Sequence, residues 1–308
     1  MESEKSVENS REIYVAIATH LDIDLLHSEI YVPVGLGNLR LRSGDTDGVM
    51  GTKLNWFLSE MSVLDRLFEE SKRSKYIGLM HYRRYLTYKT SIFKSSQELV
   101  LLYLARFAAV ILPNIRYSSD VNLKRDYKLG EIQDILTEES VKLRSDLQDE
   151  VVLVPVKKRY SASRNRDRLG GVIGMFTLNL VNEIVQNKSD KFNKYWLRTQ
   201  NEYTIRPANI FAMPSEYFKI YYEITKPILT EFYEVTTLNG QNRSRHLWRL
   251  GGYLQEHLSN AFYSFIEEEY GAQLKELWMV EVDIDPGHLS TDRLSKLENL
   301  KKIWKGEK

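Results

Sequence analysis

A dense group of side chains that can bind an anion follows one predicted buried strand. The apolar run Tyr76–Met80 leads directly into His81-Tyr82-Arg83-Arg84-Tyr85. In open α/β sheets, ligands bind beyond the carboxyl ends of the strands, which is where this group would lie. Guanidinium groups match phosphate oxygens with two hydrogen bonds, and tyrosine rings can flank a base or a sugar. The group predicts a phosphate-bearing ligand; the alternative is a surface strand end whose arginines pair with nearby carboxylates.

The elements that must position these side chains alternate along the chain. Short apolar runs indicate buried strands, and apolar residues recurring every three or four positions indicate helices. Strands are predicted at 13–19, 75–80, 108–112, 151–154 and 210–213, and helices near 53–70, 96–107, 131–148, 172–187, 214–234 and 251–268. This alternation predicts an α/β fold with a mainly parallel central sheet and a helical C-terminal part. The polar, glycine-bearing segment 20–51 is predicted to be a long loop.

Length and composition narrow the function classes. The 308 residues fit one large domain, expected over 12–282, with a lysine-rich peripheral helix or tail over 283–308. The chain has no cysteine, which excludes thiolate metal sites, disulfides and cysteine nucleophiles. The 43 Lys and Arg balance the 42 Asp and Glu to a net charge of +1, whereas nucleic-acid binders usually carry a basic excess. We therefore expect no nucleic-acid partner.

Hydropathy predicts a cytoplasmic location. Residues 1–11 are polar, with no apolar core of a secretory signal. The longest apolar stretch, Leu99–Leu112, is shorter than the roughly 20 residues needed to span a bilayer. Peripheral contact with the inner face of the plasma membrane is compatible with this composition.

Further short motifs accompany the block Tyr76–Leu86, which reads YIGLMHYRRYL. They are Ala18-Thr19-His20, Tyr31–Gly35, Gly44-Asp45, Asn55, Glu60, Asn209–Met213 and Arg249–Leu258. Together they resemble a family of bacterial surface-polysaccharide glycosyltransferases, long catalogued only as a domain of unknown function, that includes galactofuranosyltransferases. The resemblance covers roughly residues 12–265, with the His81–Tyr85 signature as its most specific part. It implies a single Rossmann-like domain of the A-type glycosyltransferase class.

The chain departs from the family pattern in three motifs. Lys53-Leu54-Asn55 replaces an adjacent Lys-Asn pair, and Glu60-Met61 replaces Glu-Leu. His257 stands where the family has an arginine after the late glutamate. These differences indicate a divergent member with an altered choice of donor or acceptor.

The resemblance implies transfer of a sugar, such as galactofuranose, from a UDP-sugar. The acceptor would be a lipid-linked O-antigen or capsular glycan, and the reaction would invert the anomeric carbon. Donor-binding residues are expected to be Thr19, His20, Asp47, His81, Tyr82, Arg83 and Arg84. Asn209 and Arg249 are expected on the acceptor side. A loop position for His20, a turn cap for Asn209 and a solvated basic face for 243–249 are the simpler alternatives.

No cofactor is expected beyond the donor itself. Many nucleotide-sugar transferases of this class hold a divalent cation with an Asp-x-Asp after a mid-sheet strand, which neutralises the diphosphate. That place is taken here by His81–Arg84, and cationic side chains can neutralise a diphosphate without metal. Mn²⁺ or Mg²⁺ bound by Asp45 and Asp47 is the less favoured alternative.

A carboxylate must remove the proton from the acceptor hydroxyl as it attacks. Glu256, on the polar edge of the helix 251–268, is the first candidate, with Asp45 and Glu60 next and Asp47 after them. A solvated surface glutamate is the ordinary alternative for Glu256. Two other functions stay open: a non-catalytic nucleotide- or glycan-binding subunit of a polysaccharide assembly, and a metal-dependent hexosyltransferase that uses Asp45 and Asp47.

Overall fold

The computed structural model describes part of the chain. The described residues are 11–21, 23–36, 45–46, 57–88, 123–127, 129–159, 163–237 and 249–282. For Asp45, Thr46, Glu60, Arg159 and the strand 123–127, the description covers the backbone alone. The predicted helix 96–107, the strand 108–112 and the tail 283–308 lie outside these residues.

A nine-stranded sheet forms the centre of the fold. Its strands are β1 Ile13–Thr19, β2 Tyr31–Gly35, β3 Asp45–Thr46, β4 Tyr76–His81, β5 Arg84–Thr87, β6 Leu123–Tyr127, β7 Val152–Pro155, β10 Phe211–Pro214 and β11 Leu274–Val282. The main path runs β10-β7-β11-β5-β4-β1-β2-β3, with β6 on β11. A separate two-stranded sheet pairs β8 Lys158–Arg159 with β9 Thr204–Ile205.

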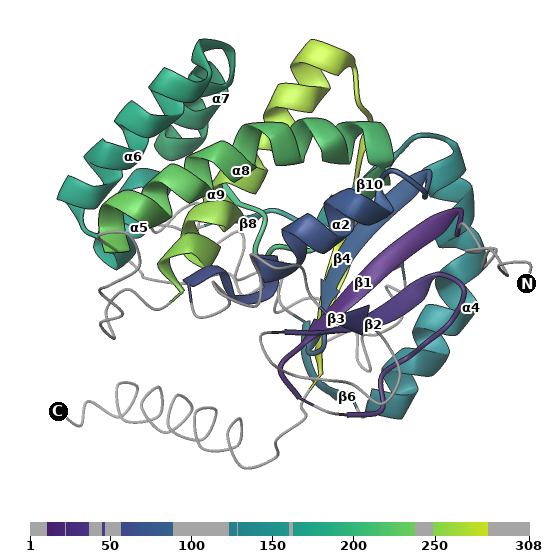
Figure 1. The fold of residues 1–308 in the computed structure, drawn as a ribbon. Helices are drawn as coiled ribbons and strands as arrows, with labels where there is room; N and C mark the ends of the chain where they lie inside the picture. Colours follow the sequence, from purple (N-terminus) through teal and green to yellow (C-terminus); the bar gives the residue numbers. More distant parts are fainter. Residues whose placement is uncertain are drawn as a thin grey trace, which may run out of the picture.

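Helices cover both faces of the sheet (Figure 1). They are the 3-10 helix η1 Ser59–Val63, then α2 Leu64–Glu70, α4 Leu129–Gln148, α5 Asn165–Ile173, α6 Met175–Lys188, α7 Asp190–Asn201, α8 Ser215–Thr237 and α9 Leu250–Tyr270. α4 lies on one face, whereas α2 and α8 lie on the other. α5, α6 and α7 gather at the far end of α8 and α9, away from α4.

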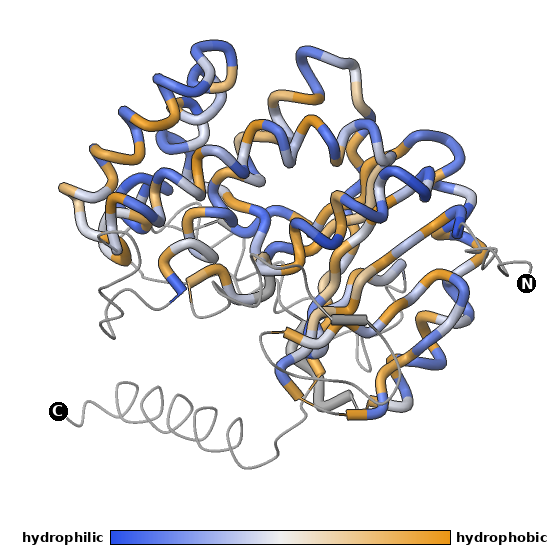
Figure 2. The backbone as a smooth tube through the Cα atoms, in the orientation of Figure 1, coloured by the Kyte–Doolittle hydropathy of each residue, from blue (hydrophilic) through white to orange (hydrophobic). Residues whose placement is uncertain are grey.

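β1 is apolar from Ile13 to Ala18 because both of its faces are buried. Tyr14, Ala16 and Ala18 point into the core under α8 and α9. Ile13, Val15 and Ile17 point into the core under α4. Because both faces of the strand are buried, no charged residue interrupts it, and Figure 2 shows orange segments along the strands of the sheet.

The prediction of a mainly parallel sheet is only partly correct, because the sheet is mixed: parallel pairings join β1 to β2 and β4, β2 to β3, and β11 to β6 and β7, whereas the remaining pairings are antiparallel. β1 lies between β2 and β4 in parallel register, so the predicted neighbours 13–19 and 76–80 are confirmed. After His81 the chain turns back at once into β5, which is antiparallel to β4 and to β11. β10 adds to the other edge of β4 antiparallel and also pairs with β7. The pairings β4-β5-β11-β7-β10-β4 close a barrel-like ring.

Several helices and strands differ from the predicted set. The predicted helix 172–187 is two helices, α5 and α6, which bend by 113° at Gly174. The predicted loop 20–51 contains β2, and α7 and β11 were not predicted. Within the described part of the chain, no single helix is long and apolar enough to cross a membrane.

Candidate functional site

The carboxyl ends of β1 and β4 meet at one edge of the sheet. Ala18 stands opposite His81 in the parallel register, and the Tyr82 amide donates to the Ala18 carbonyl at 3.0 Å. Thr19 is buried, and its hydroxyl donates to the Leu21 carbonyl at 2.8 Å and accepts from the Leu21 amide at 3.0 Å. The Thr19 side chain therefore shapes the turn that carries His20.

Three aromatic rings lie together at this edge. The His20 ring centre is 6.3 Å from that of His81 and 6.4 Å from that of Tyr82, both edge to face. His81 and Tyr82 lie 4.4 Å apart. His20 is exposed, whereas His81 and Tyr82 are buried. The structure thus brings together the predicted residues of the two strand ends.

Arg83 and Arg84 occupy the turn that follows β4. The Arg83 guanidinium lies over the Tyr82 ring, 5.2 Å from its centre. The backbone amide of Arg83 donates to His81 Nδ1 at 3.4 Å. Arg84 Nε lies 3.6 Å from Glu281 Oε1 on β11. The Nε atoms of both arginines are buried and form no hydrogen bond with any residue that the structure describes. Arg83 Nε therefore retains a donor, whereas Arg84 Nε faces Glu281 at ion-pair distance.

Arg249, expected at the acceptor, joins this group from a distant part of the chain. It caps the amino end of α9 in the left-handed conformation, with φ of 64°, and its Nε donates to Ser59 Oγ at 3.0 Å. Its positive charge contributes to the electrostatics of His81. Arg83, Arg84 and Arg249, gathered around His81, are called the arginine cluster below.

Two glycines allow the amino end of α9 to approach η1. A Cβ at Gly251 would lie 2.5 Å from the Phe57 ring, and a Cβ at Gly252 would lie 3.1 Å from the Leu58 carbonyl oxygen. Ser59, which follows directly, has a φ of 52°. The sequence Arg249-Leu250-Gly251-Gly252 therefore sets the position of Arg249 through close backbone packing.

The arginine cluster determines the charge state of His81. Burial is the main cause of a pKa well below the ordinary value, and the positive charges of Arg84, Arg83, His20 and Arg249 lower it further. His81 is therefore neutral at pH 7. Since Nδ1 accepts the Arg83 amide, Nε2 carries the proton and can donate to a ligand.

The predicted carboxylates differ in how far the structure describes them. Glu256 lies on α9, seven residues after Arg249, so the two are about 10 Å apart along the axis and on the same side of the helix. Its side chain is half-buried. The Glu60 backbone lies in η1 and that of Asp45 in β3, whereas Asp47 lies outside the described residues. Among the residues described with side chains, no group of three or more His, Asp or Glu is arranged to hold a metal ion.

Asn209 and Glu281 complete the site. Asn209 Nδ2 donates to the Gly252 carbonyl at 3.2 Å, and its buried Oδ1 has no partner in the described part of the chain. Glu281 was not among the predicted residues. The strand register sets it opposite Arg84, and the only sequence signal was a charged residue within the apolar run of β11.

His257 makes stability depend on pH. It is buried in α9, and burial together with the Arg168 charge lowers its pKa to about 3. Histidine in the unfolded chain titrates near 6.5, so below that pH the unfolded state takes up a proton that the native state does not bind. We expect the free energy of unfolding to fall as pH drops, by about 2 kcal/mol for this group between pH 7 and 5. Denaturant titration of His257→Gln at several pH values should show a flatter profile than wild type.

The exposed His27 offers the matched control. His27→Gln removes an imidazole from the surface and leaves the buried His257 in place, so we expect it to keep the wild-type pH profile. His81, whose pKa is also lowered, adds a loss of the same sign and leaves some slope in His257→Gln. Equal slopes for His257→Gln and wild type would contradict the assignment of His257 as a buried neutral group.

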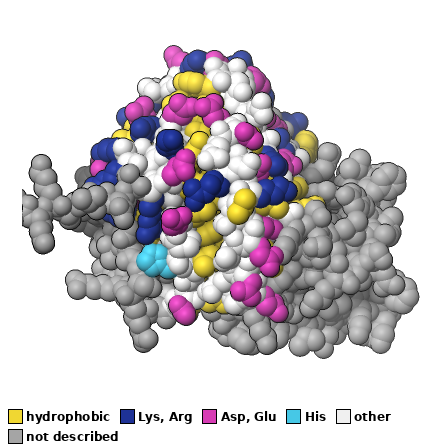
Figure 3. All heavy atoms as spheres, turned by 90° about the vertical axis from the view of Figure 1, so that its right-hand side faces the viewer, with side chains coloured by type: hydrophobic (Ala, Val, Ile, Leu, Met, Phe, Trp, Pro, Cys, Tyr) yellow, Lys and Arg dark blue, Asp and Glu magenta, His cyan; other side chains and the backbone are white. Residues whose placement is uncertain are grey.

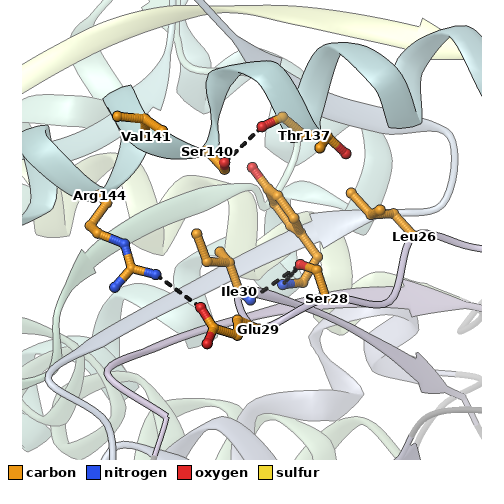
Figure 4. A pocket seen from close by; sticks show the side chains of 9 residues that line it. Leu26, Ser28, Glu29, Ile30, Thr137, Ser140, Val141 and Arg144 are labelled. Carbon is orange, nitrogen blue, oxygen red and sulfur yellow. Dashed lines mark hydrogen bonds and ion pairs between the residues drawn. The ribbon is translucent and has the colours of Figure 1, made fainter.

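A cavity of about 380 Å³ lies elsewhere, between the segment 26–31 and α4 (Figure 4). Arg144 at its rim binds Glu29 and also Glu12, the residue before β1. The cavity is therefore near the amino end of β1, opposite the arginine cluster. On the described part of the face toward α4, Lys and Arg alternate with Asp and Glu around apolar side chains, typical of a solvated surface (Figure 3).

Comparisons with known proteins give a family and a fold. The model of a family described as a domain of unknown function (DUF4422) matches residues 13–267. A comparison with curated proteins finds no match. Among solved structures, the chain is similar to the apo structure of WbbM, a bifunctional glycosyltransferase, with a TM-score of 0.70 at 17% identity. The alignment covers 88% of this chain and 45% of the WbbM chain, so this chain spans less than half the length of WbbM. The similarity shows that the two share a fold.

Proposed function

The chain belongs to the DUF4422 family, and from this and the arginine cluster we propose that it is a glycosyltransferase. The donor is a nucleoside diphosphate sugar. The sequence resemblance favours UDP-galactofuranose, from which galactofuranose would be transferred. The acceptor is a growing O-antigen or capsular glycan. The WbbM structure, titled a bifunctional glycosyltransferase, supports the reaction class through its fold.

One observation carries the proposal: Arg83 and Arg84 occupy the turn at the carboxyl end of β4, and the positive charge of Arg249 acts on His81 at the same edge of the sheet. Glu281 lies near Arg84, with its Oε1 atom 3.6 Å from Arg84 Nε. The guanidinium groups of Arg83 and Arg84 suit a diphosphate, because a guanidinium group can donate two parallel hydrogen bonds to phosphate oxygens. This is the end of the sheet where α/β folds bind ligands.

In the proposed reaction, an acceptor hydroxyl attacks the anomeric carbon while the nucleoside diphosphate departs. Arg84 and Arg83 stabilise the negative charge that builds up on the leaving phosphate, and Arg249 adds a third positive charge from α9. Neutral His81 donates from Nε2 to a phosphate or ribose oxygen. Tyr82 supports the Arg83 guanidinium, and the exposed His20 ring flanks the base.

Glu256 is the proposed base that removes the acceptor proton. Its place on the same side of α9 as Arg249 separates it from the diphosphate by about two helical turns, which leaves room for the sugar. Asn209 then binds an acceptor hydroxyl through Oδ1, the atom without a partner in the described part of the chain. Asp45 and Glu60 are the other candidates for the base, and the A-type fold class stays a prediction.

Turnover tests the proposal against its rival, a binding subunit that does not catalyse. A ligand that binds the native state raises the melting temperature. At a ligand concentration a hundred times Kd, it increases the free energy of unfolding by about 2.7 kcal/mol. A thermal-shift screen of nucleotide sugars should therefore identify the donor. With that donor and a glycan acceptor, we expect release of the nucleoside diphosphate. Saturable binding without release would favour a nucleotide-binding subunit, and no shift with any nucleotide sugar would contradict the glycosyltransferase proposal.

A further inference from the structure

The corner between α5 and α6 exposes a group of large apolar side chains. Phe176 is 86% exposed, Val172 50% and Met175 44%. They lie within five consecutive positions, on the last turn of α5 and the first turn of α6. Exposed large apolar residues gathered at one place mark a site of interaction.

A sharp bend and close packing hold the corner in this form. Gly174 has a φ of +88°, which allows the 113° bend between the two helices. A Cβ at Gly170 would lie 2.1 Å from Met175 Sδ, so Met175 packs directly over that glycine. The opposite faces of both helices are already buried, through Leu169, Ile173, Leu178 and Val181.

Positive charges accompany the corner. Arg164, Arg166 and Arg168 lie on or next to the first turn of α5, against one acidic residue, Asp167. Arg166 is exposed, and its Cα is about 9 Å from that of Val172 along the helix. Such a distance is close to one Debye length, about 8 Å at physiological salt, over which an anionic surface attracts a cation.

The extent of the apolar patch limits how deep the corner can insert. Beyond the first turn of α6, its exposed side includes Asn179 and Glu183. Together α5 and α6 reach the length and hydropathy of a membrane span, but the bend and their buried faces oppose spanning. The patch is suited to the interface of a bilayer, where apolar side chains insert by about 5–10 Å beneath the headgroups.

We propose that the α5–α6 corner docks the protein on an anionic lipid bilayer, with Phe176 and Val172 inserted and the α5 arginines on the headgroups. The inference extends the proposed function, because an acceptor anchored in lipid would then be held near the enzyme. The corner is also close to α9, since the Arg168 charge acts on His257. The proposed docking surface therefore lies on the α9 side of the molecule, and Arg249 of the arginine cluster caps that helix.

The absence of cysteine makes a direct test possible. Phe176→Cys, labelled with an environment-sensitive fluorophore, should brighten several-fold on vesicles of phosphatidylcholine with phosphatidylglycerol. Val141→Cys is the control, because Val141 is 77% exposed on α4 at the other side of the molecule. Its label should not respond. Equal responses at the two sites, or none at residue 176, would overturn the proposal.

Sedimentation of the full chain with vesicles supplies the second measurement. Val172→Ser with Phe176→Ser should weaken binding by about tenfold or more, as withdrawing large apolar side chains predicts. Arg166→Glu should weaken binding to anionic vesicles, whereas Val141→Ser should bind like wild type. If the label at 176 responds to protein concentration without vesicles, the corner is an interface between copies and the proposal fails. These assays contain no sugar nucleotide, so they can fail while the glycosyltransferase proposal holds, and the reverse.

Discussion

Replacing Arg84 by alanine is expected to lower kcat of sugar transfer by about 10²–10³-fold, as for other preorganised charged groups. The interaction of Arg84 with the phosphate is strongest in the transition state, when the leaving group gains negative charge. The loss of activity should therefore appear in kcat more than in KM. Arg84→Lys should recover part of the activity, because it keeps the charge but lacks the planar fork. Steady-state kinetics with the donor identified by thermal shift would measure both variants.

Arg144→Ala is the matched control. Arg144 also pairs with glutamates, Glu12 and Glu29, but at the opposite end of β1. Its loss should leave kcat unchanged. Arg84→Ala also leaves Glu281 without its partner, so the melting temperature of each variant should be measured beside the kinetics. Near-normal kcat in a folded Arg84→Ala protein would contradict a role for Arg84 in leaving-group stabilisation.

The second large effect is expected from Gly251→Ala. The added Cβ would meet the Phe57 ring at 2.5 Å. Phe57 cannot move away easily, because its ring packs against Phe232 at 5.6 Å and Tyr233 at 5.3 Å. Overpacking of this kind costs about 1–3 kcal/mol. The amino end of α9 must shift, and Arg249 then loses its contact with Ser59.

We expect the melting temperature of Gly251→Ala to fall, and kcat/KM to fall by about tenfold or more at a temperature where the variant is folded. Gly130→Ala on α4 is the control, since no atom lies within 4 Å of its Cβ position. A Gly251→Ala protein with wild-type stability and activity would show that α9 does not depend on this close packing.

Local patterns were sufficient for much of the fold. β1 and β4 were predictable because burial on both faces leaves unbroken apolar runs. β2 was missed because Pro33 and Gly35 weaken the strand signal. The mixed sheet was missed because the orientation of β5 and β10 depends on a tight turn and on long-range pairing. Gly174, which divides α5 from α6, resembles any other glycine within an apolar helical pattern.

The site was predictable where its residues are consecutive. His81–Arg84 follow one strand, and their anion-binding character was evident from residue type and from the resemblance. The influence of Arg249 on His81 was not evident, because the two residues are more than 160 positions apart in the chain. The position of Glu281 opposite Arg84 could not be predicted, because it depends on the register between β5 and β11, which no local sequence pattern indicates. The specific signature His81–Tyr85 and the donor sugar stay predictions.

Donor turnover by the wild-type protein with and without EDTA tests most directly whether the arginine cluster neutralises the diphosphate. We predict nearly unchanged turnover in EDTA, because guanidinium groups supply the charge that a metal ion would otherwise provide. Turnover abolished by EDTA and restored by Mn²⁺, with Arg84→Ala close to wild type, would contradict the account and assign the chemistry to a metal held by Asp45 and Asp47.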